Sequence, residues 1–213
     1  MRYLCVGDVH GHASALSAVI AAAERKGSVD ALLVAGDLFF AGPEPLQTYR
    51  ILCSRRSICV RGLTDRALVE LTSEQLHRLA NNEHTMQQAI EFDRVRKSLG
   101  ELGLQWLKNQ KNIEHLALED GRLLALVHGS PLDPSEPITH DLSADEVAVL
   151  LADDPASVFV CAMTHVPFVH EVGERSVVNV GSVGESATKN AAHGTIIDST
   201  VAGVVIDPIE VAL

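Results

Sequence analysis

The motif Gly7-Asp8-Val9-His10 and the dipeptide Gly36-Asp37 decide the fold that this sequence predicts. Each follows a short apolar run, and a stretch with helical periodicity separates them, which indicates a β-α-β unit. In an open α/β sheet, ligands bind beyond the carboxyl ends of the strands, where both motifs lie. Because carboxylate and imidazole are metal-ligand groups, we expect Asp8, His10 and Asp37 to share one metal-binding crevice.

The same residues have a purely structural interpretation. Asp8 and Asp37 each precede a helical segment, and aspartate is a favoured helix N-cap. We prefer the metal interpretation because later strands end in the same way, with His128 after one apolar run and His165 after another. One histidine alone is more often a surface or core residue than a ligand, but five candidates with the same placement favour a site.

Composition limits the function classes. With 213 residues the chain is one domain, or one domain with an insertion, and a hydrophobic share of 46% is sufficient for a core. Aromatic residues make up only 4%, so aliphatic residues must fill that core. The formal net charge of −11 argues against binding to a nucleic-acid duplex or to an anionic membrane surface. No apolar run approaches the length of a membrane span.

The cysteines point to a reducing compartment. The four residues Cys5, Cys53, Cys59 and Cys161 show no CxxC spacing. Two of them lie in apolar, strand-like runs, so buried free thiols are expected rather than disulfides. The chain also leads directly into its first strand without the pattern of a signal peptide. We therefore expect a cytoplasmic protein.

Hydrophobic periodicity predicts alternating helices and strands in the first half of the chain and mostly strands in the second. Strands are predicted at 3–7, 31–35, 57–60, 113–118, 122–127, 158–163, 168–172 and 176–180, with a closing hairpin in 194–211. Helices are predicted at 12–26, 46–55, 83–99, 102–109 and 143–152, with another beginning near residue 72. Two facing sheets with helices outside is the simplest packing for this order.

The ordered motifs resemble the calcineurin-like metallophosphoesterase superfamily, in particular its small bacterial and archaeal phosphodiesterase branch. That family has D-x-H, then G-D, G-N-x-D, a strand-ending histidine and G-H-x-H, usually followed by N-P-G-S-x-G. This sequence has counterparts in the same order: Asp8-Val9-His10, Gly36-Asp37, Gly62-Leu63-Thr64-Asp65, His128, Ala162-Met163-Thr164-His165 and Asn179-Val180-Gly181-Ser182-Val183-Gly184. The resemblance implies an α/β fold with a single domain over residues 1–213. Its form is a four-layer α/β/β/α sandwich of two mixed β-sheets flanked by helices.

The resemblance also implies a divalent metal ion, with Mn as the first expectation and Fe, Zn, Ni or Mg as alternatives. The metal ligands carried over are Asp8, His10, Asp37, His128 and His165. Leu63 stands where the family has a ligating asparagine, and Met163 stands where it has the first histidine of G-H-x-H. In the family both positions serve the second ion, so we expect one firmly bound ion and a second that is weak or absent.

Further roles follow from the same resemblance. The implied catalytic residues are His10, Asp37, His128 and Asp65, the last matching a carboxylate that orients a histidine or the backbone at the site. Arg61, Arg66 and His12 are candidate substrate-binding residues. The two arginines fit a plain surface role equally well, and His12 also fits a solvent-facing helix start.

The resemblance implies a metal-dependent phosphoesterase, with phosphodiesterase-type hydrolysis of a small phosphate ester by a metal-bound hydroxide. The two substituted ligand positions keep an alternative open, because fold does not guarantee function. In that alternative the chain is a catalytically inactive relative that serves as a binding or scaffold protein. A homo-oligomer is compatible with the sequence.

Overall fold

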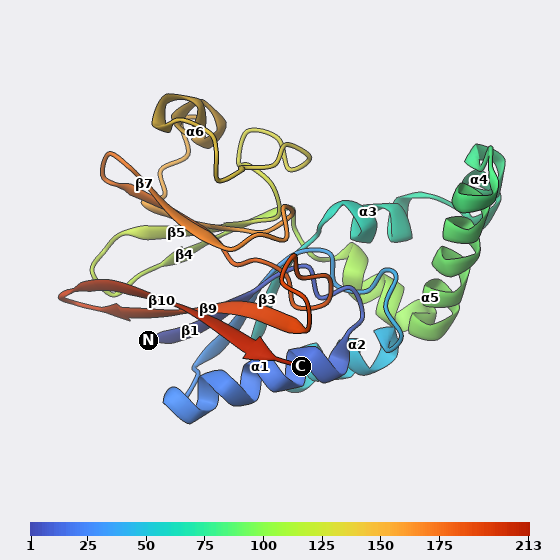
Figure 1. Ribbon diagram of the computed structural model, residues 1–213, viewed down its shortest axis with the longest axis horizontal. Helices are drawn as coiled ribbons and strands as arrows, with labels where there is room; N and C mark the ends of the chain where they lie inside the picture. The colour runs from blue at the N-terminus through green and yellow to red at the C-terminus, as the bar shows by residue number, and fades with distance from the viewer.

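The structure is a computed structural model that describes residues 1–213, and it contains two five-stranded sheets with helices on their outer faces (Figure 1). The strand orders are β10-β9-β1-β2-β3 and β4-β5-β6-β8-β7. The strands are β1 (Arg2–Val6), β2 (Ala31–Ala35), β3 (Ser57–Val60), β4 (Ile113–Ala117), β5 (Leu123–Val127), β6 (Val158–Cys161), β7 (Phe168–Val172), β8 (Arg175–Asn179), β9 (Ala191–Thr200) and β10 (Gly203–Ala212). The helices are α1 (Ala13–Lys26), α2 (Pro45–Ser54), α3 (Leu63–Glu70), α4 (Ser73–Leu79), α5 (Glu83–Lys108) and α6 (Ala144–Leu151). The predicted sandwich of two mixed sheets is confirmed.

The alternation of side chains along the strands explains the layers. In β1, Leu4 and Val6 pack with the helices on the outer face of the first sheet, whereas Tyr3 and Cys5 pack between the two sheets. The second sheet repeats this pattern, with its outer face covered by α6. Successive residues of a strand point to opposite faces, so strands with apolar residues at every position must be buried on both sides.

Strand direction brings the site loops together. In the first sheet β1, β2 and β3 run parallel, and in the second β5, β6 and β8 run parallel. The carboxyl ends of parallel strands lie at one edge of a sheet, as ligand sites in α/β sheets require. The two edges meet, because the ring of His128 after β5 donates a hydrogen bond from Nδ1 to the carbonyl of Ala35 at the end of β2, at 2.8 Å.

Three helices inserted after β3 form the most extended part of the molecule. In Figure 1, α4 and the adjoining part of α5 project away from the sheets. The backbone of α5 is non-helical at Gly100, which divides it close to where the sequence predicts two separate helices. Helix α3 begins at Leu63, immediately after β3, because the carboxylate of Asp65 accepts a hydrogen bond from the amide of Gly62 at 3.0 Å. This start was not predicted.

All four cysteines are free thiols, and all but Cys53 are buried, as predicted. No helix in the structure combines the length and the apolar character that a membrane crossing needs.

Candidate metal centre

Two groups of metal-ligand side chains meet at the joined sheet edges, and both contain Asp8. The first group is Asp8, His10 and His165, and the second group is Asp8, Asp37 and His128. Within each group, one ligand atom per residue lies within 4.8 Å of the others. All five predicted metal ligands are therefore brought together by the fold.

The spacing of the donor atoms fits a single ion in each group. Two atoms that are each about 2.1 Å from one ion lie about 3.0 to 4.2 Å apart, for bond angles from about 90° to about 180°. In the first group, His165 Nε2 lies 3.4 Å from His10 Nε2 and 3.7 Å from Asp8 Oδ2. In the second, His128 Nε2 lies 3.7 Å from Asp37 Oδ2.

Backbone carbonyls orient two of the imidazole rings. Nδ1 of His128 hydrogen-bonds the carbonyl of Ala35, and Nδ1 of His10 hydrogen-bonds the carbonyl of Phe40. When Nδ1 carries the proton, Nε2 presents its lone pair, which is the form that a metal-binding histidine takes. Both rings thus direct Nε2 into the ligand cluster.

Two polar atoms of the cluster lack any hydrogen-bond partner, and both are buried. They are Oδ1 of Asp8 and Nε2 of His128. The exposed fraction is 0% for Asp8 and 1% for His128. Buried polar atoms without partners are costly and rare, and a cation bound between them would supply the missing interaction. The residues present therefore fit a divalent metal ion.

The pKa shifts of the cluster residues also favour a bound metal ion. Burial raises the pKa of Asp8 well above its usual range, and the neighbouring charge of Asp37 raises it further. Burial lowers the pKa of both His128 and His165, so their rings are neutral near pH 7. A bound dication would favour the charged form of the Asp8 carboxylate, and it needs imidazole rings that are not doubly protonated. The buried Asp8 and the neutral rings of His128 and His165 are therefore complementary to a dication.

Backbone strain is concentrated at the same place. Seven residues other than glycine have a positive φ, and five of them belong to the cluster or its motifs, namely Asp8 (47°), His10 (48°), Asp37 (50°), Met163 (72°) and His165 (60°). Such conformations cost about 1–3 kcal/mol each and persist where the surroundings enforce them, often at functional sites. Backbone strain therefore coincides with the ligand cluster and its motifs.

The glycines of the motifs allow the loops to approach each other. Gly36 has φ +85°, and a Cβ atom there would lie 2.8 Å from Nδ1 of His128. A Cβ atom at Gly62 would overlap Oδ1 of Asp37. Glycine is thus required at both positions for Asp37 to reach the ligand cluster.

A family model described as a calcineurin-like phosphoesterase superfamily domain matches residues 1–201 of this chain. The chain belongs to the calcineurin-like phosphoesterase superfamily. Among solved structures, a hypothetical protein of Pyrococcus horikoshii has a TM-score of 0.85 at 17% identity, with 99% of this chain and 88% of that one covered. A metallophosphoesterase from Sphaerobacter thermophilus has a TM-score of 0.75 at 24% identity, with 99% and 89% covered. At these identities the two structures support the fold.

The curated relatives that this chain matches have a name that is more specific than that of the superfamily. A symmetrical bis(5'-nucleosyl)-tetraphosphatase from Pseudomonas fluorescens is 34% identical over 158 residues, which cover 72% of this chain and 52% of the relative. One of the same name from Pseudomonas putida is 32% identical over 157 residues, covering 72% and 51%. The chain spans about half the length of the curated relatives it matches. The family match and these relatives support the predicted class, a phosphoric ester hydrolase.

Neither of the two substituted positions offers a side-chain nitrogen or oxygen to a metal ion. Met163 donates its amide hydrogen to Oδ2 of Asp8 at 2.9 Å, but its side chain offers only a thioether. Leu63 is the first residue of α3 and is 38% exposed, with no donor atom. The next residue, Thr64, donates both its amide and its hydroxyl to Oδ1 of Asp37, at 2.9 and 2.8 Å.

Two residues near Asp37, Thr64 and Asp65, hold the loops of the site in place. Thr64 holds one carboxylate oxygen of Asp37, so Oδ2 is directed toward His128, and no pattern in the sequence predicts this contact. Asp65 was predicted among the catalytic residues as a carboxylate that orients a histidine or the backbone, and its buried carboxylate accepts hydrogen bonds from the amides of Leu38 and Gly62. The geometry makes Asp65 a positioning residue, because its oxygens are used by the backbone.

The three predicted substrate-binding residues differ in whether they border the ligand cluster. Arg66 donates to Oγ of Ser135 at 2.9 Å, and its positive charge contributes to the lowered pKa of His128. Arg61 lies 3.8 Å from Glu70, and its side chain is mostly buried. His12 immediately precedes α1 and packs against Gly184, since a Cβ atom at Gly184 would lie 2.5 Å from its Cδ2. Arg66 and His12 therefore border the site, whereas Arg61 is directed toward Glu70.

One acidic residue at the site was missed by the sequence interpretation. Oε2 of Glu185 lies 3.8 Å from Nε2 of His10. It follows the motif 179–184 directly, but no spacing in the sequence relates it to Asp8 or His10. Only the folded chain brings it to the first group.

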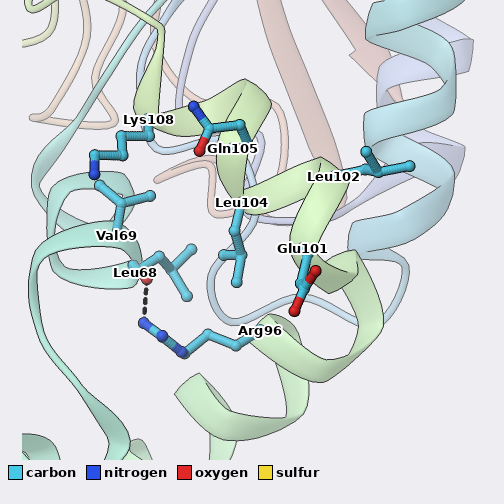
Figure 2. A pocket seen from close by; sticks show the side chains of 8 residues that line it. All are labelled: Leu68, Val69, Arg96, Glu101, Leu102, Leu104, Gln105 and Lys108. Carbon is cyan, nitrogen blue, oxygen red and sulfur yellow. Dashed lines mark hydrogen bonds between the residues drawn. The ribbon is translucent and has the colours of Figure 1, made fainter.

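The ligand cluster is separate from a cavity of about 490 Å³ between α3 and α5 (Figure 2). In that cavity Arg96 donates a hydrogen bond to the carbonyl of Leu68, near the end of α3. None of the predicted site residues lines it. The metal centre, not this cavity, carries the chemistry that the motifs predict.

Proposed function

We propose that this chain is a metal-dependent phosphoesterase that hydrolyses small phosphate esters of the nucleotide type. The observation that carries the proposal is the pair of buried ligand groups that share Asp8, with unpartnered atoms on Asp8 and His128. Membership in the superfamily supports the reaction class.

Each side chain of the cluster has a distinct task in this proposal. Asp8, His10, Asp37 and His165 would hold the firmly bound ion, with Asp37 shared with the second ion as the resemblance implies, and the carbonyl of Phe40 keeps Nε2 of His10 directed at the ligand cluster. A divalent ion in such a site lowers the pKa of a bound water and polarises a phosphoryl oxygen. Asp37 and His128 hold a second ion weakly, or His128 contacts the phosphate through its unpartnered Nε2.

The donor set also bears on the metal and its occupancy. Imidazole and carboxylate ligands together suit Mn, with Fe, Zn, Ni and Mg as alternatives. Leu63 and Met163 leave the second ion with Asp37 and His128 of its four expected ligands, whereas all four residues expected at the first ion are present. We therefore propose one firm manganese site and one weak site in a single domain. The free thiols agree with a reducing, cytoplasmic compartment.

Relatives named for the hydrolysis of bis(5'-nucleosyl) tetraphosphates make this class the first substrate to test. Two features of the site are compatible with a phosphate chain. Arg66 borders His128, and a guanidinium binds phosphate oxygens through two parallel hydrogen bonds. The ion offsets the excess of carboxylates in an otherwise acidic protein.

The test measures hydrolysis of diadenosine tetraphosphate and of a chromogenic phosphodiester by protein loaded with Mn²⁺. We expect metal-dependent turnover that is lost with chelator and falls at least about 100-fold in His128→Asn. His170→Asn, on the edge strand β7, is the matched control and should retain the wild-type rate. A protein that binds Mn²⁺ but turns over neither substrate at millimolar metal would instead support the inactive, ligand-binding relative.

A further inference from the structure

The carbonyl of Phe40, which orients the ring of His10, belongs to the loop between β2 and α2. This loop is bound to the backbone of the first motif. The amide of Gly11 donates to the carbonyl of Leu38 at 2.9 Å, and a Cβ atom at Gly42 would overlap the carbonyl oxygen of His10. The direction of the His10 ring therefore depends on where residues 38–42 are held.

A second set of contacts holds the same loop from α5, a helix of the insertion after β3. Nη2 of Arg94 donates to the carbonyl of Gly42 at 2.7 Å and to that of Ala41 at 3.3 Å, across 52 residues of sequence in the first case. The ring of Phe92 stacks on the ring of Phe40, with centroids 3.9 Å apart and planes inclined by 16°. Two side chains of α5 thus hold the backbone and the side chain of the segment that contains the Phe40 carbonyl.

The guanidinium of Arg94 is itself held in place. Its Nε donates to Oε2 of Glu91, one turn earlier on α5, at 2.6 Å. Because the group is planar, fixing Nε also fixes the direction of the nitrogen that donates to the loop. The side chain of Arg94 is 40% exposed, so it contributes little to the core. Its removal would mainly release the loop carbonyls.

We propose that Arg94 and Phe92 are positioning residues of the metal centre. They hold the loop so that the carbonyl of Phe40 keeps Nε2 of His10 directed at the ligand cluster. A partner that hydrogen-bonds the far side of a metal-binding imidazole fixes its tautomer and orientation, and thereby supports metal affinity. The inference rests on the proposed metal site, and it gives the inserted helix α5 a part in that site that none of the motifs indicates.

The test is a calorimetric titration of metal-free protein with Mn²⁺. Loss of a direct partner of a metal-binding histidine typically costs about 10–100-fold in affinity, and Arg94 acts one contact further out. We therefore expect Arg94→Ala to raise the Kd of the tight site about three- to ten-fold with the number of sites unchanged. Arg55→Ala is the matched control, because Arg55 is 41% exposed and likewise pairs with a glutamate, Glu24, at 2.7 Å. It should bind as the wild type does.

Conservative variants and a spectroscopic readout separate positioning from a general loss of stability. Arg94→Lys keeps a charged donor for the loop carbonyls and should recover part of the affinity. Phe92→Tyr keeps the stacked ring and should bind as the wild type does, whereas Phe92→Leu should weaken binding. In the metal-free protein, the ring ¹⁵N shifts of His10, assigned with His10→Asn, should report a proton held on Nδ1 in the wild type and a mixture of both tautomers in Arg94→Ala.

Kd values for Arg94→Ala and Phe92→Leu that both stay within two-fold of the wild type would overturn the proposal. So would His10 ring shifts in Arg94→Ala that equal those of the wild type. None of these readouts involves turnover. A wild-type protein that binds Mn²⁺ with this dependence on Arg94, yet hydrolyses no phosphate ester, would refute the proposed function and leave this inference standing.

Discussion

The two ligand groups of the metal centre share Asp8 but differ in what surrounds it. The first group has two imidazoles whose Nε2 atoms lie 3.4 Å apart, with the carboxylate of Glu185 beside them. The second group has one buried imidazole, one further carboxylate, and two neighbouring positions where the side chains are leucine and methionine. The fold is equally ordered around both, so the difference lies in donor atoms alone.

This contrast separates what the backbone does from what the side chains do. At the second group the amides of Met163 and Thr64 still hold Asp8 and Asp37 in place. The backbone that positions Asp8 and Asp37 is therefore in place, although neither Leu63 nor Met163 offers the side-chain ligand that the resemblance implies at its position. Substitutions at positions 63 and 163 can therefore supply the missing ligand atoms without a change of fold.

The largest effect is expected from Asp8→Asn, because Asp8 belongs to both groups. Loss of the charged oxygen that lacks a partner should raise the Kd for Mn²⁺ by more than about 100-fold and abolish turnover. Asp207→Asn is the matched control, since Asp207 is an exposed partner of Lys26. Calorimetry with Mn²⁺ checks the prediction. Tight binding by Asp8→Asn would mean that the two groups do not share this residue.

The double change Leu63→Asn with Met163→His should make the second group resemble the first. We expect the number of bound Mn²⁺ ions to rise from about one to about two per chain and turnover to rise about ten-fold or more. Elemental analysis after dialysis and the phosphodiester assay measure the two effects. The matched control is Leu102→Asn with Met86→His on the exposed face of α5. If the repaired protein binds no additional ion, the assignment of positions 63 and 163 to the second ion is wrong.

The comparison also shows how far the sequence predicts this molecule. The ligands Asp8, His10, Asp37, His128 and His165 were predictable because each follows an apolar run, and parallel strands align such ends at one sheet edge. Glu185 and Thr64 were not predictable in the same way. Their contacts depend on loop paths, which follow from hydrogen bonds such as those of Ser182 to the carbonyl of Asp8 rather than from a periodic pattern.

The sequence places Asp65 at the site but leaves open whether it orients a histidine or the backbone. Its place in a G-x-x-D motif indicates a site residue, and the residue is indeed close to Asp37. Whether its carboxylate faces a metal ion or the backbone depends on where α3 begins. Asp65 caps the start of α3, so its carboxylate is turned toward the amides of Gly62 and Leu38.

Asp65, which is buried next to Asp37, should make the unfolding free energy of the metal-free protein depend on pH. Burial, and then the charge of Asp37, raise the pKa of Asp65 to about 8 from an ordinary value of 3.8. A raised pKa in the folded state stabilises fully below the unfolded pKa, and this contribution is lost as the pH rises through about 8. Relative to Asp65→Asn, which stays neutral, the metal-free wild type should lose more than about 1 kcal/mol of unfolding free energy between about pH 5 and about pH 8.

Denaturant unfolding of both proteins across this range measures the difference. A difference that stays constant, or that grows in favour of the wild type as the pH rises, would contradict the buried, protonated state of Asp65.

The smallest effect is expected from Thr64→Val, which keeps the shape of the side chain but removes the hydroxyl that donates to Asp37 at 2.8 Å. The amide bond from Thr64 to the same oxygen remains, so the loss of stability should be about 0.5–1.5 kcal/mol. Because Asp37 groups with Asp8 and His128 rather than with His10 and His165, the change should weaken the weak Mn²⁺ site by up to about ten-fold and the tight site less. Thr64→Ser restores the hydroxyl and should bind as the wild type does. An equal loss at both sites in Thr64→Val would show that Asp37 serves the two ions together, and the contrast between the groups would then rest on Leu63 and Met163 alone.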